Sequence, residues 1–223
     1  MKKKTIAIDG ASSSGKSSVA KFLAKKINFR ALDSGSLYRS LTYYGLKNIG
    51  KDLNLKMELL LRYLHEHPHT LQIEWQGNQS IALLMGKPAP EEIRSEEVTQ
   101  LVHAVAENAF CRSFINKLLI RAAFRHDIVV EGRDIGTEVF PDAWKKFFLT
   151  AAPVIRAQRK AKEMGIPFPS EPFNRLFQTI ENRDAKDKNR TLAPLRKAED
   201  AMEIDVSFLE IPEVVDLMMK HLD

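Results

Sequence analysis

The stretch Gly10-Ala11-Ser12-Ser13-Ser14-Gly15-Lys16-Ser17 constrains this chain more than any other. It follows a short apolar run at 5–8 and precedes a helical pattern that begins near Lys16. A glycine turn between a strand and a helix gathers backbone N–H groups around one point, and the positive end of the helix dipole faces that point. Its natural occupant is polyphosphate. The motif therefore predicts a phosphate-binding loop on an α/β fold.

The same loop supplies the candidate residues for binding ATP and its metal ion. Lys16 places an ammonium on the outer phosphates, and the Ser17 hydroxyl can take one position on a Mg²⁺ held between them. An ordinary small-residue turn is the alternative, but here the strand and the helix stand on the correct sides of the motif. The candidate ATP-binding residues are Gly10, Ala11, Ser12, Ser13, Ser14, Gly15, Lys16, Ser17 and Ser18.

Apolar periodicity predicts the order of the other elements. A helix at 17–27 and a strand at 29–32 complete a βαβ unit with the first strand, so the centre of the sheet should be parallel. Further strands are expected at 127–131, 147–149 and 201–205, and helices at 37–46, 55–64, 91–108, 112–125, 153–164 and 211–222, with a charge-dense helix around 183–190. We therefore expect one domain over 1–223, with helices on both sides of a central parallel sheet.

One segment breaks this pattern. Residues 71–75 alternate apolar and polar side chains, 76–78 have the composition of a turn, and 80–85 form a second strand candidate. The alternation is typical of a half-buried hairpin. We expect a small β-containing insertion within 65–95.

Charge and composition limit the classes of partner. The formal charge of +5 allows an anionic partner, and 151–200 hold eleven Lys or Arg against seven Asp or Glu. Nucleic acid is disfavoured as that partner, because the chain has neither an aromatic-rich strand pair nor a Lys-rich stripe. Lone Cys111 excludes an internal disulfide, and no export signal or membrane-length apolar run is present. We expect a soluble, cytoplasmic monomer with small-molecule substrates.

Several short motifs, taken together, resemble bacterial cytidylate kinases. After the phosphate loop come Leu32-Asp33-Ser34-Gly35-Ser36-Leu37-Tyr38-Arg39, then Glu131-Gly132-Arg133-Asp134-Ile135-Gly136-Thr137. Arg183-Asp184 through Asn189-Arg190 and Ala193-Pro194-Leu195 follow in the same order. The resemblance runs from residue 5 to about 205. The loop alone fits many families, whereas the later segments in this order are highly specific.

The resemblance implies transfer of a phosphoryl group from ATP, with Mg²⁺, to CMP or dCMP. It implies a three-layer P-loop fold, with 65–95 as an inserted monophosphate-binding lobe and 156–172 as a helical lid. The implied substrate-binding residues are Arg39, Arg133 and Arg190 at the phosphate, Arg183 and Asp187 at the ribose, and Ser34, Arg112 and Asp134 at the cytosine. The implied catalytic residues are Lys16, Arg133, Arg156, Arg159 and Arg190, with Arg156 and Arg159 facing the transferred phosphate from the lid.

Two positions depart from the family pattern. His103 stands where a base-contacting serine aligns, and Glu131 opens a motif in which aspartate is frequent. Asp134 can still accept a hydrogen bond from the cytosine amine, where uracil presents an acceptor instead. Arg112 can donate to the ring, although at a helix start it could be simply solvated. We therefore expect CMP to be preferred over UMP, with a kinase for UMP or another small acceptor as the alternative.

The residues leave some roles open. Asp9 either orients a water of the Mg²⁺ shell or caps a turn. Asp33 and Glu131 are alternative acidic partners of the metal. Arg183 and Asp187 stand four positions apart, so they could instead form a surface ion pair.

Overall fold

The computed structural model describes residues 3–50, 52 and 56–222. Its strands are β1 (Thr5–Gly10), β2 (Arg30–Asp33), β3 (Leu71–Gln76), β4 (Gln79–Leu84), β5 (Lys87–Pro88), β6 (Ile128–Gly132), β7 (Lys145–Thr150) and β8 (Met202–Asp205). Its α-helices are α1 (Lys16–Lys26), α2 (Ser34–Ile49), α3 (Met57–Glu66), α4 (Glu96–Ala106), α5 (Ala109–Arg125), α6 (Pro153–Met164), α7 (Glu171–Asn189) and α8 (Ile211–Met219). Two short helical segments, η1 (Glu91–Arg94) and η2 (Ile135–Val139), complete the described elements.

Eight strands of the described residues form one sheet in the order β3-β4-β2-β6-β1-β7-β8, with β5 paired to β4. All pairings from β4 to β8 along this path are parallel, and β3 and β5 run antiparallel to β4. The β1 strand lies at the centre, with β6 on one side and β7 on the other. The prediction of an α/β fold with a central parallel sheet is confirmed.

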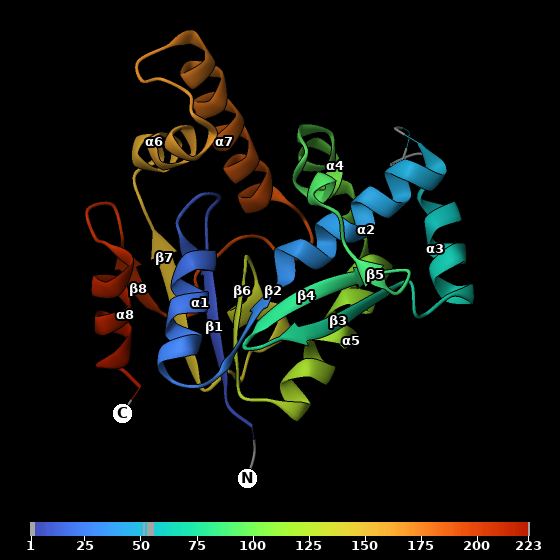
Figure 1. The fold of residues 1–223 in the computed structure, drawn as a ribbon, viewed down its shortest axis with the longest axis horizontal. Coiled ribbons are helices and arrows are strands. Elements are labelled where there is room, and N and C mark those ends of the chain that lie inside the picture. Colours follow the sequence, from blue (N-terminus) through green and yellow to red (C-terminus); the bar gives the residue numbers. More distant parts are fainter. Residues whose placement is uncertain (1–2, 51, 53–55, 223) are drawn as a thin grey trace.

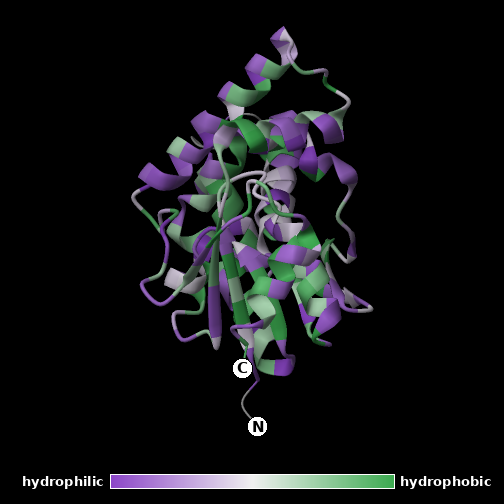
Figure 2. Ribbon diagram, turned by 90° about the vertical axis from the view of Figure 1, so that its left-hand side faces the viewer, coloured by the Kyte–Doolittle hydropathy of each residue, from purple (hydrophilic) through white to green (hydrophobic). Residues whose placement is uncertain are grey.

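Helices cover both faces of the sheet (Figure 1). In β1, Ile6 and Ile8 point into the core formed with α1 and α8, whereas Ala7 points into the core formed with α2, α3 and α5. This alternation follows from the two-residue period of a strand, so a strand buried on both faces must be apolar throughout. Figure 2 shows the result, with hydrophobic central strands and hydrophilic outer surfaces on the helices.

Several helix boundaries differ from the sequence-based expectation. The helix expected at 37–46 begins at Ser34, because the Asp33 carboxylate accepts a hydrogen bond from the Ser36 amide at 3.0 Å and caps the helix. The single helix expected over 91–108 is split into η1 and α4 at Ser95, whose hydroxyl caps α4. Part of the helix expected at 55–64 falls on 55, outside the described residues, and α3 is observed from Met57.

The hairpin expected within 65–95 is present as β3 and β4, and it extends the central sheet at one edge. Its connection to the sheet is narrow: β4 pairs with β2 at Ala31 and Gln79, and the Ala31 amide donates to the Asn78 carbonyl at 2.7 Å. The assignment of this segment as a monophosphate-binding lobe stays a prediction.

The α6–α7 pair stands beyond the carboxyl edge of the sheet (Figure 1). It has a small core of its own, formed by Ala157, Ala161, Phe173 and Ile180. The lid expected at 156–172 therefore covers most of α6 and the start of α7, and the helical pair continues to Asn189. Among the described residues, no helix combines the length and apolar character needed to cross a bilayer.

Candidate active site

The phosphate loop connects β1 to α1. The loop needs glycine at two points: a Cβ on Gly10 would collide with the Leu149 carbonyl, and Gly15 has a φ of 84°, in the left-handed region. Lys16 opens α1 and folds back, so that its Nζ donates to the Ala11 carbonyl at 2.9 Å. This arrangement provides the helix N-terminus and the lysine that polyphosphate binding requires.

Lys16 is buried, and its charge is costly in the free protein. Its pKa is lowered to about 7, chiefly by burial and then by Arg133, while Glu131 acts in the opposite direction. A bound polyphosphate would favour the charged form, because an opposite charge at close range stabilises an ammonium. The loop is thus electrostatically suited to an anion.

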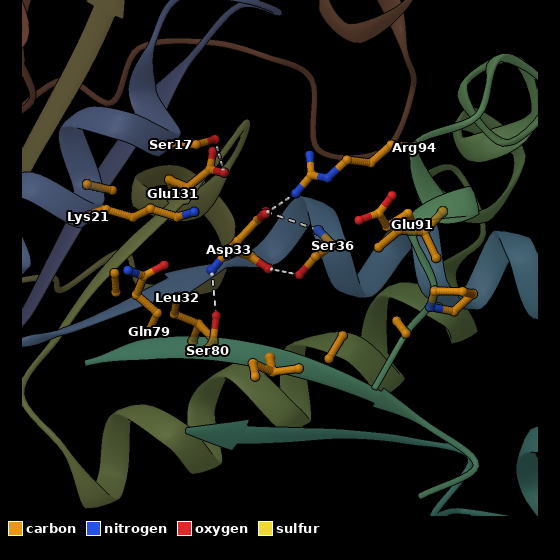
Figure 3. Close-up of a pocket in the computed structure, with 17 residues that line it drawn as sticks. Ser17, Lys21, Leu32, Asp33, Ser36, Gln79, Ser80, Glu91, Arg94 and Glu131 are labelled. Atoms are coloured by element: carbon orange, nitrogen blue, oxygen red, sulfur yellow. Dashed lines mark hydrogen bonds and ion pairs between the residues drawn. The ribbon is translucent and has the colours of Figure 1, made fainter. Parts of the chain in front are cut away.

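Ser17 and Glu131 face each other at one end of a cavity of about 470 Å³ between α1, β2 and β4 (Figure 3). The Ser17 hydroxyl donates to Glu131 Oε1 at 2.6 Å. The pKa of Glu131 is raised to about 7, chiefly by burial and then by neighbouring Asp33. Hydroxyl and carboxylate oxygens are the donors that Mg²⁺ takes, so this corner fits the ion. No cluster of three or more metal-type side chains occurs among the described residues, so water and phosphate oxygens would supply the other ligands.

Asp9, near the end of β1, is buried and binds backbone amides. Its two carboxylate oxygens accept hydrogen bonds from the amides of Ile135 at 2.8 Å and Gly136 at 2.7 Å. Burial raises its pKa to about 6, although these two bonds act against the shift. Of the two roles left open for Asp9, the geometry matches the cap: it anchors η2 after β6.

A buried carboxylate, Asp134, joins two arginines from distant parts of the chain. One oxygen pairs with Arg112 of α5, and the other accepts from Arg190 at the end of α7 at 3.0 Å. Arg112 also donates to the Ala106 carbonyl at 3.2 Å, and Arg190 donates to the Ala193 carbonyl. All three charged groups are less than one-tenth exposed, so Arg112 is not merely solvated.

A second charged network lies between this cluster and the phosphate loop. Arg133 Nε donates to Asp187 at 2.8 Å, and Arg183 donates to the Ser12 hydroxyl at 3.3 Å. Burial lowers the pKa of Arg183 to about 10, and Arg133 contributes to the shift. Asp187 thus pairs with Arg133, and the surface pair considered for Arg183 and Asp187 is not the arrangement found.

Arg156 and Asp184 fix the loop from the side of the helical pair. Arg156 donates to the Ser12 carbonyl at 2.9 Å and forms an ion pair with Asp184, which accepts from the Ser12 amide at 3.1 Å. No role was expected for Asp184, although its place beside Arg183 in a charge-dense helix was the available signal. Arg156 is buried against the loop, and its expected role in facing the transferred phosphate stays a prediction.

Comparison with known proteins agrees with this geometry. The family model described as cytidylate kinase matches residues 6–223. The chain belongs to the cytidylate kinase family. Curated cytidylate kinases from Thermodesulfovibrio yellowstonii and Fervidobacterium nodosum are 36% and 40% identical, covering 99% and 96% of this chain and 98% and 94% of their own. A third, from Desulforamulus reducens, is 41% identical over 99% of this chain and 97% of its own.

A solved structure supports the fold alone. An uncharacterized protein from Eubacterium ventriosum aligns over 100% of this chain and 99% of its own, with a TM-score of 0.53 at 13% identity.

Among the residues assigned by resemblance to cytidylate kinases, two arginines point elsewhere than expected. Arg159 donates to the carbonyls of Val206 at 2.5 Å and Ser207 at 3.2 Å, in the connection between β8 and α8. Arg39 donates to the Ile93 carbonyl at 3.1 Å and the Thr99 hydroxyl at 2.9 Å. Arg159 makes these bonds through Nη2 and Arg39 through Nη1, and the role at phosphate implied for each stays a prediction.

The remaining assigned residues lie near the carboxyl edge of the sheet. The Ser34 hydroxyl donates to the Glu131 carbonyl at 2.7 Å, which ties the start of α2 to β6. His103 lies in the last turn of α4. The structure thus joins Arg112, Asp134 and Arg190 in one cluster, pairs Arg133 with Asp187, and sets Arg183 against Ser12 of the loop. The roles that the resemblance implies for these residues in substrate binding stay predictions.

Proposed function

We propose that this chain transfers the γ-phosphoryl group of ATP to CMP or dCMP, giving ADP and CDP or dCDP. The observation that carries the proposal is the buried arginine cluster centred on Asp134, which lies at the same edge of the sheet as the phosphate loop. Membership of the cytidylate kinase family supports the same reaction.

ATP binds with its phosphates on residues 10–18, and the acceptor nucleotide binds on the side of Arg133 and Arg190. Ser17, beside Glu131, would hold Mg²⁺, which would supply positive charge to the phosphates. Arg133 is near enough to Lys16 to lower the pKa of the lysine, and in this proposal both cations act on the transferred phosphoryl group. Phosphoryl transfer requires little covalent chemistry from the protein, and these cations act by positioning and by stabilising negative charge.

Asp134 selects the base in this proposal. Its carboxylate accepts a hydrogen bond from the exocyclic amine of cytosine, a pairing that acidic side chains make with this amine. Uracil would place a carbonyl against the carboxylate and leave both acceptors unpaired. A site built on such hydrogen bonds can discriminate by about 10⁴-fold or more.

The residues proposed to bind both nucleotides come from one chain, so we also propose that the enzyme acts as a monomer. We place it in the cytoplasm, where its single cysteine, the buried Cys111, would stay reduced. We propose no nucleic-acid or membrane partner.

An acceptor panel tests the function. The purified protein is given ATP and Mg²⁺ with CMP, dCMP, UMP or AMP, and ADP release is followed in a coupled assay. We expect turnover with CMP and dCMP and much lower kcat/KM with UMP and AMP. Turnover that is fastest with UMP would favour the alternative acceptor, and no turnover with any pyrimidine nucleotide would overturn the proposal.

A further inference from the structure

Tyr38 carries a buried hydroxyl that has no hydrogen-bond partner in the described chain. The residue lies in α2, one helical turn after Ser34, and its ring packs against the core beneath the sheet's carboxyl edge. Buried polar groups in native proteins are nearly always paired, and each exception needs an explanation. An unpaired hydroxyl destabilises the free protein unless another state of the molecule uses it.

The groups around Tyr38 belong to the Asp134 cluster. The Arg112 guanidinium lies over the Tyr38 ring, with its Cζ 5.9 Å from the ring centroid. Burial raises the pKa of Tyr38 far above its usual value, and the charges of Arg112, Asp134 and Arg190 all reach the hydroxyl. The group is therefore neutral and protonated at any physiological pH, with a hydrogen available to donate.

The nearest charged groups already have partners. Each carboxylate oxygen of Asp134 is paired with an arginine, and Arg112 also donates to a backbone carbonyl. A ligand that enters the cluster would supply the hydrogen-bond acceptor that the Tyr38 hydroxyl lacks. The Tyr38 hydroxyl is neutral, and the charges of Arg112 and Asp134 beside it are already paired. These surroundings favour an uncharged planar ring as the ligand over a phosphate.

We propose that Tyr38 is a nucleobase-binding residue, whose hydroxyl donates a hydrogen bond to the ring carbonyl of the acceptor pyrimidine. The inference rests on the proposed function, because it takes the base to lie at Asp134. The exocyclic amine is assigned to Asp134, so Tyr38, which donates, is matched to the ring carbonyl. That oxygen has two lone pairs, so it can accept from Tyr38 even where Arg112 also donates to the ring. Cytosine and uracil share this carbonyl, so Tyr38 contributes affinity for pyrimidines while Asp134 chooses between them.

The Tyr38→Phe variant tests this role, since it removes the hydroxyl and keeps the ring. We expect KM for CMP and for dCMP to rise about threefold to tenfold, the effect of one neutral hydrogen bond. Inhibition by UMP should weaken by the same factor, and KM for ATP should stay unchanged. Without nucleotide, the variant should melt at the same temperature as the wild type or higher, because an unpaired buried hydroxyl has been removed.

Tyr44→Phe is the matched control. Tyr44 lies further along the same helix, where its ring packs on Tyr63 with a centroid distance of 5.0 Å. Removing its hydroxyl should leave KM for CMP unchanged.

Three results would overturn the inference. The first is an unchanged KM for CMP in Tyr38→Phe. The second is a parallel rise in KM for CMP and ATP together with a lower melting temperature. The third is a rise in KM for CMP without a rise in KM for dCMP, which would indicate a ribose contact. A wild-type protein that does not phosphorylate CMP would instead remove the proposed function, and that result is read before any variant is made.

Discussion

Asp134 shows how a single buried carboxylate can organise a site. Its two oxygens hold arginines from α5 and from the end of α7, which are far apart in the sequence. Burying three charges is costly, and the cost is offset only while each charge keeps its partner. The cluster is therefore a place where one substitution affects both stability and substrate binding.

Replacing Asp134 with Asn should test this coupling. Two buried guanidinium groups would lose their counter-charge, so we expect the free energy of unfolding to fall by about 3–5 kcal/mol. The kcat/KM for CMP should fall far more than the affinity for ATP. Urea denaturation and calorimetry with ATP measure the two effects, and Asp142→Asn, at an exposed position, is the control. Equal losses for CMP and ATP would remove Asp134 from the base site.

Lys16→Ala should abolish turnover without unfolding the protein. The loss of an ammonium at the transferred phosphate should reduce kcat by at least about 10²- to 10³-fold. Stability should not fall, because the lysine is buried with a pKa of about 7 against 10.5 in the unfolded chain, so its charge destabilises the free fold. Single-turnover kinetics and circular dichroism measure the two properties. Undiminished activity would refute the role of Lys16.

Glu131 gives the free protein a predictable pH dependence. Its pKa is about 7 in the fold and about 4.5 when unfolded, so between these values the folded state binds more protons. The contribution of Glu131 to stability therefore falls as pH rises from 4.5 to 7. Glu131→Gln lacks this titration. Its unfolding free energy relative to that of the wild type should therefore increase by about 1–3 kcal/mol as the pH is raised from 5 to 8. A stability difference that stays constant across this range would contradict the assignment.

At the scale of elements, the α6–α7 pair is the part most separable from the sheet. Its small core contains no residue of the two larger clusters. It is connected to the phosphate loop at Ser12, whose backbone binds Arg156 and Asp184 and whose hydroxyl accepts from Arg183. Opening this pair would loosen the loop without unfolding the strands, as expected for segments that move during catalysis.

Phe173→Ala should loosen the α6–α7 pair selectively. The Phe173 ring is buried and lies 4.5 Å from Phe168, centroid to centroid, so its loss should cost about 3–5 kcal/mol in local stability. Hydrogen exchange should become faster in 153–189 while the central strands keep their protection, and KM for ATP should rise. Phe168→Ala, at a half-exposed position, should have a smaller effect. Uniformly faster exchange along the chain would show that the pair is not an independent unit.

At the scale of the whole molecule, the fold brings two binding regions to one edge of a sheet. The phosphate loop follows β1, and the Asp134 cluster follows β6, the strand next to it. The carboxyl ends of neighbouring parallel strands are adjacent, which is why open α/β sheets bind ligands there. Two nucleotides can then lie end to end.

A thermal-shift experiment tests whether the two nucleotides occupy separate regions. A non-hydrolysable ATP analogue and CMP, each at 100 times its Kd, should each stabilise the protein by about 2.7 kcal/mol. Together they should stabilise it by at least the sum, because each would bind the same folded state at its own region. A combined effect no larger than the greater single effect would mean that the two compete for one site.

Local chemistry explains which parts were predictable. The phosphate loop, the βαβ unit and α6 follow from motifs and periodicities within a few residues, and the structure confirms them. The start of α2 was placed three residues too late, because the cap that Asp33 provides was not anticipated. The fold class needed only the order of strands and helices, since a right-handed crossover makes the central sheet parallel.

The sequence by itself determined the loop, the fold class and the set of candidate residues. Only the tertiary structure decided their partners: Asp134 with Arg112 and Arg190, Asp187 with Arg133, and Arg156 with the Ser12 backbone. These contacts join elements far apart in the chain, so no local spacing encodes them. They form because buried charges require partners, and the packing of the whole sheet determines which charges meet.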